Sequence, residues 1–394
     1  MPVYLFHSTE TGLAGIQGSG LGTMITALDA MLVNGVNSSA TGWSASWAGG
    51  TITYSKTGHG MPVGAPGVVL TITGFSPAGY NINNQTVVVV DANTITLAAS
   101  NPGSTPATGT GTVLRSPCSV SGTAWTKAFS GTNLANYRQP NVAGSNKFYL
   151  GYDDSVAQNS RWRGFETGSA AGAADGSGTA PFPSAAQQTG GSYHYRSSTN
   201  DATARPWTMV SNGASFYFFN QYSGLTTIGT GLFFGDFTSY KTSDAYNTIA
   251  IGDIVASAIT AANIRILAVA TTLAVTTGHY VPRSYTQTGT SVNVGKHINA
   301  VFSNATTEIG AAGLTYPIGV EGGIMLSPIW LSETTNGIRG HLPGLWAPCH
   351  NRPLTHGDTF SGATGTPLEG KTFEVITTSA TGQVVIETSN TWDA

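Results

Sequence analysis

Apolar residues recur at spacings of three and four along one stretch of the chain, residues 19–34. At this spacing six side chains share one face of a helix: Leu21, Met24, Ile25, Leu28, Met31 and Leu32. Gly35 follows directly, and glycine commonly ends a helix because it adopts left-handed backbone angles. The pattern therefore predicts one N-terminal helix, whose apolar stripe is expected to lie against a sheet.

Most other apolar positions form short runs that predict β-strands. Between residues 49 and 115 such runs cover 68–73, 86–90 and 94–98, separated by turns rich in proline, glycine or asparagine. Later runs of the same character cover residues 147–152, 161–165, 193–196, 207–210, 215–220, 231–237, 324–331, 340–346, 371–376 and 383–387. Residues 263–275 are apolar and β-branched and predict a buried pair of strands. The expected fold class is mainly β.

Residues 49–115 differ from the flanking sequence because their short strand-like runs follow one another closely with turn residues between them. This change predicts an inserted small β-sandwich or barrel. Similar segments flank it, GWS before and WTK after, and an insertion in a surface loop costs little free energy. The expected host is a discontinuous β-sandwich or barrel-like domain of residues 1–48 and 116–335 that carries the helix. Residues 336–394 are expected to form a C-terminal β region packed on this host.

Charged residues make up only 9% of the chain, against roughly 25% in an average soluble domain. The 16 lysines and arginines are scattered singly, so the sequence lacks the basic face that a nucleic-acid partner requires. A surface poor in charge suits a permanent assembly, where charged groups would have to be desolvated. The alternative is an ordinary monomer that serine, threonine and asparagine keep in solution.

The sequence also bears on location. Its first residues lack the basic start and apolar run of a secretory signal, and no stretch approaches the roughly 20 apolar residues of a membrane span. Cys118 and Cys349 lie far apart and do not form a disulfide framework, and their role stays open. These features predict a soluble protein made in the cytoplasm.

Candidate catalytic groups are few. Asp153 and Asp154 are the one adjacent acidic pair, and with Glu166 they form a candidate carboxylate couple for sugar hydrolysis. We favour the alternative, a turn at the end of a strand with solvated carboxylates. The sequence therefore predicts no catalytic residue and no cofactor.

Candidate metal ligands gather near the C-terminus at His341, Cys349, His350 and His356. Their spacing matches no closed cysteine–histidine pattern, and one loop-rich segment would also have to supply their supporting contacts. We therefore expect ordinary surface or interface histidines and no metal.

Aromatic residues crowd residues 162–219 with few charges between them. Such strands can form a core, an obligate interface or a surface on which sugars stack, and the sequence does not separate these alternatives.

Several stretches carry a resemblance to a known family. In the host they are LDAMLVNGV, GTAWTKAFSGTNLANYRQ, KFYLGYDD, RGFET, GGSYHYRSSTNDATARPW, FGDFTSYKTSDAYNT, IRGHLPGLWAPCHNRPLTHGDTFSGATGTPLEGKTFEVI and ETSNTW. With them the chain resembles virion structural proteins of tailed bacteriophages and prophages over nearly its whole length except residues 49–115. The segments GHGMPVGAPGVVLTITGF and VVVVDANTITLA are similar to small β-domains that decorate phage tail and surface proteins. The resemblance implies no catalytic residues.

The expected function is therefore that of a virion structural protein that assembles with copies of itself in a ring and with other virion proteins. A tail component such as a nozzle, ring, tip or fibre anchor is the first expectation, and a capsid decoration or head-fibre protein is the alternative. A protein that binds or depolymerises host surface glycan is a third. Leu342, Leu345 and Trp346 lie among proline and glycine, and are the candidate interface because a rigid aromatic anchor loses little entropy on binding.

Overall fold

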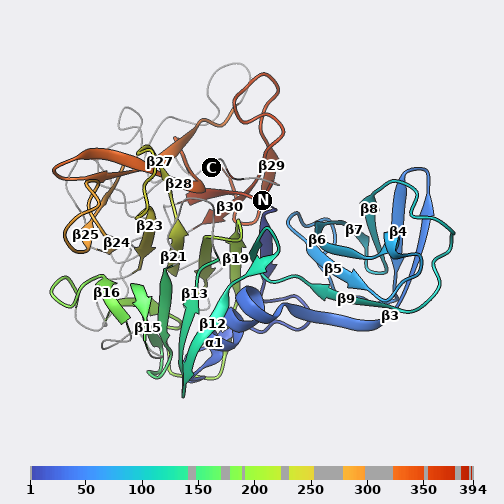
Figure 1. Cartoon of the computed structure of the whole chain (residues 1–394), viewed down its shortest axis with the longest axis horizontal. Coiled ribbons are helices and arrows are strands. Elements are labelled where there is room, and N and C mark those ends of the chain that lie inside the picture. Colours follow the sequence, from blue (N-terminus) through green and yellow to red (C-terminus); the bar gives the residue numbers. More distant parts are fainter. Residues whose placement is uncertain are drawn as a thin grey trace.

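The computed structural model describes residues 2–140, 148–169, 178–188, 191–222, 230–252, 278–297, 323–349, 354–377, 383–389 and 392. The described secondary structure is mostly antiparallel strands, with one main helical segment (Figure 1). The predicted mainly-β fold class is confirmed. The strand pair expected at 263–275 lies outside the described residues. Within the part of the chain that the structure describes, no helix has the length and apolar character needed to cross a membrane.

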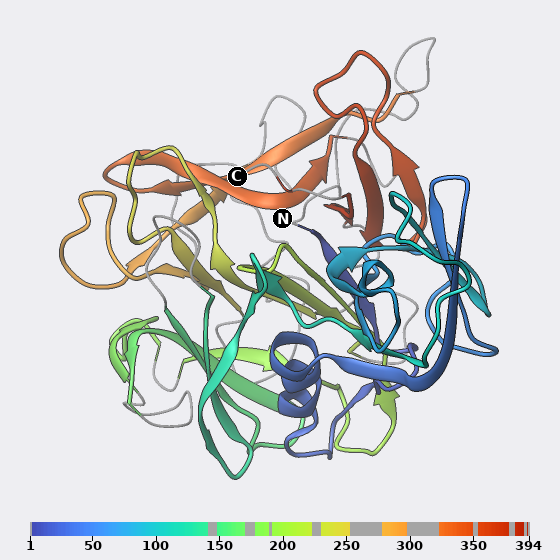
Figure 2. The same cartoon turned by 45° about the vertical axis from the view of Figure 1, so that its right-hand side comes forward.

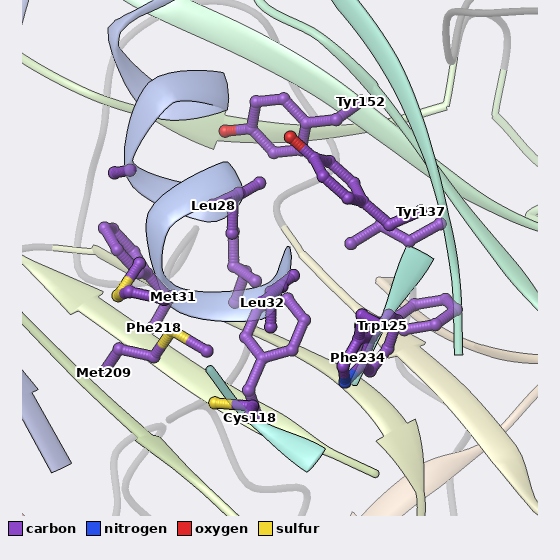
Figure 3. Close-up of a cluster of buried hydrophobic side chains, with 14 of the residues drawn as sticks. Leu28, Met31, Leu32, Cys118, Trp125, Tyr137, Tyr152, Met209, Phe218 and Phe234 are labelled. Atoms are coloured by element: carbon purple, nitrogen blue, oxygen red, sulfur yellow. The ribbon is translucent and has the colours of Figure 1, made fainter. Parts of the chain in front are cut away.

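The helical segment is shorter than the predicted range of 19–34. It consists of α1 (Thr23–Leu28) and a wider π-helical continuation, η1 (Asp29–Asn34). It begins late because Gly22 has left-handed backbone angles, with a φ of 77°. Of the six predicted stripe residues, five are buried against sheet residues such as Phe218 (Figure 3), whereas Leu21 is 47% exposed.

A seven-stranded antiparallel sheet forms the middle of the host. Its strands in spatial order are β1 (Tyr4–His7), β19 (Trp207–Ser211), β20 (Phe216–Asn220), β21 (Thr230–Asp236), β23 (Thr248–Ile251), β24 (His279–Val281) and β25 (Val292–Asn293). Side chains alternate across a strand, and here both faces are buried. Phe216 and Phe218 join the core that contains α1, whereas Tyr217 and Phe219 join a second core on the other face. The host therefore has three layers, which Figures 1 and 2 show as a stack.

The layer on the α1 side is a second antiparallel sheet. Its order is β12 (Thr126–Gly131), β13 (Leu134–Arg138), β14 (Tyr149–Asp153), β15 (Asn159–Gly168) and β16 (Gly178–Phe182), with β17 (Ser192–Tyr195) also paired to β15. Two small ladders complete this side of the host, β2 (Ile16–Gln17) with β18 (Ala204–Arg205) and β10 (Ser119–Val120) with β11 (Thr123–Ala124). Tyr137, Leu150 and Trp162 of the second sheet pack into the same core as α1.

The opposite layer is a third sheet. Its order is β26 (Gly295–His297), β27 (Leu326–Glu333), β28 (Gly337–Pro348), β31 (Gln383–Glu387), β30 (Thr372–Thr377) and β29 (Thr359–Ser361), with β22 (Thr238–Ser239) also paired to β28. The expected boundary between residues 335 and 336 falls in the turn that joins β27 to β28, which are paired strands. The C-terminal region therefore shares this sheet with residues from before 336, and packs on the central sheet through Leu342, Leu345 and Ile376.

The predicted insertion corresponds to a separate sheet that projects to one side of the molecule (Figure 1). Its order is β6 (Ile82–Thr86), β5 (Val69–Thr73), β9 (Gly111–Arg115), β3 (Val36–Ala48), β4 (Thr51–Ser55), β8 (Thr94–Ala98) and β7 (Val88–Asp91). A one-turn 3-10 helix, η2 (Ala78–Tyr80), precedes β6. The hydrophobic cluster of this sheet runs from Trp43 to Val113. The expected boundary at 48/49 falls in the β3–β4 turn, so the sheet begins earlier in the chain than the sequence pattern predicted.

Contacts with β1 fix the base of the inserted sheet to the host. The Leu5 N–H donates to the Gly67 carbonyl at 3.1 Å. Arg115, only 1% exposed, forms an ion pair with Glu10 (Nε to Oε2, 3.0 Å), and its guanidinium also donates to the Leu5 carbonyl. The same guanidinium lies 4.7 Å from the centre of the Phe6 ring. The inserted sheet is therefore joined to the host by buried contacts as well as by its two chain connections.

Candidate functional site

The three candidate catalytic carboxylates each bind a different arginine. Asp153 pairs with Arg161 at 2.8 Å, Asp154 with Arg196 at 3.1 Å and Glu166 with Arg283 at 2.6 Å. A glycosidase couple needs two carboxyl groups that flank the substrate, one of which gives up a proton. Carboxylates held by guanidinium groups favour a structural role for all three. The solvated turn that the sequence favoured is also wrong, because Asp153 and Asp154 are buried.

Asp154 is the most enclosed of these groups. Its side chain and that of Arg196 are both 0% exposed. The carboxylate accepts the Met24 N–H at 3.0 Å, in the first turn of α1, and the Ser160 hydroxyl at 2.5 Å. Burial raises the pKa of Asp154, and the Arg196 guanidinium opposes that rise. The pair therefore links α1 to the second sheet.

A buried histidine lies in the same region. The hydroxyl of Tyr152 and Nδ1 of His194 are 2.7 Å apart, and His194 Nε2 lies 2.7 Å from Oδ1 of Asn220. Complete burial lowers the pKa of His194 to about 4, so the ring is neutral at pH 7. The arrangement connects the second sheet to the central sheet and places a neutral polar network inside the core.

The predicted metal candidates do not come together. His341 contacts the hydroxyl of Tyr240 at 3.1 Å, whereas His356 accepts the Thr377 N–H at 3.3 Å. Cys349 is buried, which raises its thiol pKa, and His350 lies outside the described residues. Among the described residues, no group of three or more histidine, cysteine or acidic side chains has the geometry to hold a metal ion.

The predicted interface residues are mostly core. Leu342 and Leu345 are each 1% exposed and pack between the third and central sheets, so the structure contradicts their assignment to an exposed contact. Bulges in the β27–β28 ladder shift the alternation, which turns both leucines inward. Trp346 points to the outer face of the third sheet, where it is half-buried and packs edge-to-face on Phe373.

The crowded aromatic residues are also mainly core. Trp162, Trp207, Phe216, Phe218 and Tyr217 are at most 2% exposed. Several pack in pairs, and the ring centres of Trp207 and Phe218 are 5.2 Å apart. This burial favours the core alternative over a sugar-stacking surface for these residues.

A pocket of about 430 Å³ opens where the inserted sheet, the central sheet and the third sheet meet. Its lining comes from distant parts of the sequence: Leu5, His7, Val63, Gly64, Ala65, Pro66, Thr208, His356, Gly357, Thr359 and Glu374. Val63, Gly64, Gly357 and Thr359 are exposed at its rim, whereas Leu5, Thr208 and Glu374 are buried. The pocket is our candidate functional site because it joins concave shape to titratable groups.

The titratable groups in this pocket have shifted pKa values. Burial, the charge of Arg115 and the neighbouring His356 lower the pKa of His7 to about 4. Burial likewise lowers the pKa of His356 and raises that of Glu374 to about 7. Of these three residues, the sequence singled out only His356, and as a candidate metal ligand. His7 and Glu374 carried no signal, because only the folded chain brings them together.

Many of the few charged side chains are paired with one another. Nine pairs among the described residues use eight of the 16 lysines and arginines and nine of the 19 acidic residues. Arg115, Arg196 and Arg339 lie fully buried beside their carboxylates. Charge is therefore even scarcer on the described surface than the composition suggests.

A scan against protein-family models found no matching family, and no curated protein matched the chain.

Proposed function

We propose that the chain is a structural component of a tailed-phage virion, associated with the tail, that acts by protein–protein assembly without catalysis. The scarcity of free surface charge is the observation that carries this proposal. A surface with few charged groups loses little hydration free energy when a neighbouring chain covers it. The resemblance of the host segments to virion structural proteins supports the same class.

The layered architecture also supports this role. A sheet buried on both faces gives a rigid body, and the inserted sheet projects from it on a fixed base. A projecting domain on a rigid base suits a subunit of a ring, with the host against its neighbours and the inserted sheet outward. A capsid decoration or head-fibre protein would use the same features, so the position on the particle needs its own measurement.

The test of the class and position is labelling of purified particles. Antibodies against the inserted sheet should bind particles, and electron microscopy should find the label at the tail. Label on the capsid would support the alternative position. Particles that lack the chain in mass spectrometry would overturn the proposal.

Trp346 is the predicted interface residue that stays partly accessible. Trp346→Ala removes one edge-to-face contact with Phe373, and we expect a loss of stability of about 2 kcal/mol, roughly half the cost for a fully buried tryptophan. The variant should fold in isolation and enter particles less efficiently than the wild type. Trp47→Ala, at a half-buried tryptophan in the inserted sheet, is the matched control. Equal incorporation of the two variants would place the contact elsewhere.

A further inference from the structure

The pocket at the junction of the three sheets contains a buried carboxyl group that lacks a partner. Glu374 is 7% exposed, and among the described residues no hydrogen bond or ion pair involves its carboxyl group. Every other acidic residue with comparable burial in the described chain has a hydrogen bond or an ion pair. Leaving such a group unpaired costs free energy, so it marks a place where a ligand would be favourable.

The surroundings of Glu374 define the charge of that ligand. His7 and His356 line the same pocket, and their lowered pKa values keep both rings neutral at pH 7. The charge of Arg115 acts on His7, but the Glu10 carboxylate already holds this guanidinium. Burial alone raises the pKa of Glu374, without a contribution from any neighbouring charge. The pocket can therefore acquire one negative charge and offers no positive charge to balance it.

The shape of the pocket sets the size of the ligand. Its volume of about 430 Å³ lies near the lower end of the roughly 300–1,000 Å³ of small-ligand pockets. Apolar walls come from Leu5, Val63, Ala65 and Pro66, and the carboxyl group is buried whereas the rim is exposed. An alkyl stem with a cationic end fits this arrangement, because its methylene groups contact apolar walls and its charge reaches the carboxylate.

We propose that this pocket binds the side chain of a lysine or arginine presented by another protein chain. The proposal rests on the proposed assembly function for the source of that side chain, because an assembly protein meets its neighbours through their side chains. The cation would donate hydrogen bonds to Glu374, and the hydroxyl of Thr208 offers a further acceptor. Proton and cation compete for the same carboxylate, so binding strengthens as the pH rises through about 7.

The test uses small probes and the intact chain, and so does not depend on particles. Propylguanidinium and propylammonium stand in for the two side chains, and N-propylurea is the neutral control of the same shape. Binding is measured by ligand-observed NMR titration with a chelator present, which keeps metal ions from His7 and His356. Both cations should bind, and the urea should bind at least tenfold more weakly. Affinity at pH 6 should be about tenfold lower than at pH 8, because the ionised fraction of a group with a pKa of about 7 changes by that factor.

Two variants connect the binding to the pocket. Glu374→Gln keeps the shape of the side chain and should weaken cation binding at least tenfold. Glu369→Gln, at an exposed glutamate outside the pocket, should leave it unchanged. Thr359→Trp places a large ring at the rim, directly across the strand pair from Glu374, and should block the probes without touching the core. Equal affinity for N-propylurea, or unchanged binding by Glu374→Gln and Thr359→Trp, would overturn the proposal. Probe binding together with absence of the chain from particles would overturn the assembly function and leave the cation-binding pocket standing.

Discussion

Replacing Asp154 with asparagine removes one negative charge and keeps the size and shape of the side chain. In the folded protein the carboxylate faces Arg196 at 3.1 Å, and both side chains are completely buried. The substitution leaves the guanidinium without its counter-charge, although Arg196 still donates to the carbonyls of Gln17, Gly20 and Val156. A buried charge that loses its partner destabilises the folded state strongly.

The expected loss is about 3–5 kcal/mol, the usual cost of breaking a buried pair by removing one partner. The Met24 N–H donates to Oδ2 of Asp154 and the Ser160 hydroxyl to Oδ1, so the single amide oxygen of asparagine can keep only one of these hydrogen bonds, and the expected loss includes the other. The free energy of unfolding falls by about 4 kcal/mol for each M of guanidinium chloride. A loss of about 4 kcal/mol in that free energy therefore lowers the unfolding midpoint by about 1 M.

The measurement is equilibrium unfolding followed by tryptophan fluorescence and by circular dichroism. Asp201→Asn is the control, because Asp201 also pairs with an arginine, Arg205, but is 41% exposed. Exposed pairs contribute little to stability because solvent screens them, so the control should unfold near the wild-type midpoint. An Asp154→Asn midpoint equal to that of the control would refute the structural role of the buried pair. The carboxylate would then again be a candidate for chemistry.

Three further outcomes are expected. Phe218→Ala should cost about 3–5 kcal/mol in denaturant unfolding, because the ring is fully buried within the core that contains α1. The pKa of His194 is about 4 in the folded protein, against 6.5 in the unfolded chain. Between these pH values the unfolded chain binds a proton that the folded protein does not, so the folded state loses stability as the pH falls from 6.5 to 4. The effect is about 3 kcal/mol, and His194→Gln should unfold with a correspondingly smaller difference between pH 7 and pH 4.5. Removing residues 42–111 should leave a soluble host that unfolds cooperatively, whereas removing 50–114 leaves Trp43 without its packing partners and should give aggregates in size-exclusion chromatography.

The strands were largely predictable because apolar runs between turn residues carry a local signal. Residues 94–98 and 383–387 form strands with the predicted bounds, and most other predicted runs differ by a few residues. The continuous run at 215–220 was also predicted as a strand, but its burial on both faces needed the third sheet, which the run itself does not specify. The start of the helix was missed because the left-handed Gly22 lies inside the periodic stretch.

The pairing of charges and the pocket could not be predicted. Arg339 binds Asp244, 95 positions away, and such a pair leaves no periodic pattern in the chain. His7, His356 and Glu374 share one pocket only because three sheets meet there. The predicted interface failed for a related reason, since bulges in the β27–β28 ladder decide which way Leu342 and Leu345 point.

The position of β1 at the edge of the central sheet has a consequence for synthesis of the protein. Its pairing partner is β19, and the contact between His7 and Thr208 spans 201 positions. A ribosome that adds about 5–20 residues per second needs roughly 10–40 s to make the intervening chain. The inserted sheet draws its hydrophobic cluster from residues 43–113 and can be complete during that interval. β1 therefore waits unpaired beside a finished neighbour, and nascent chains in this interval should be the ones that chaperones bind.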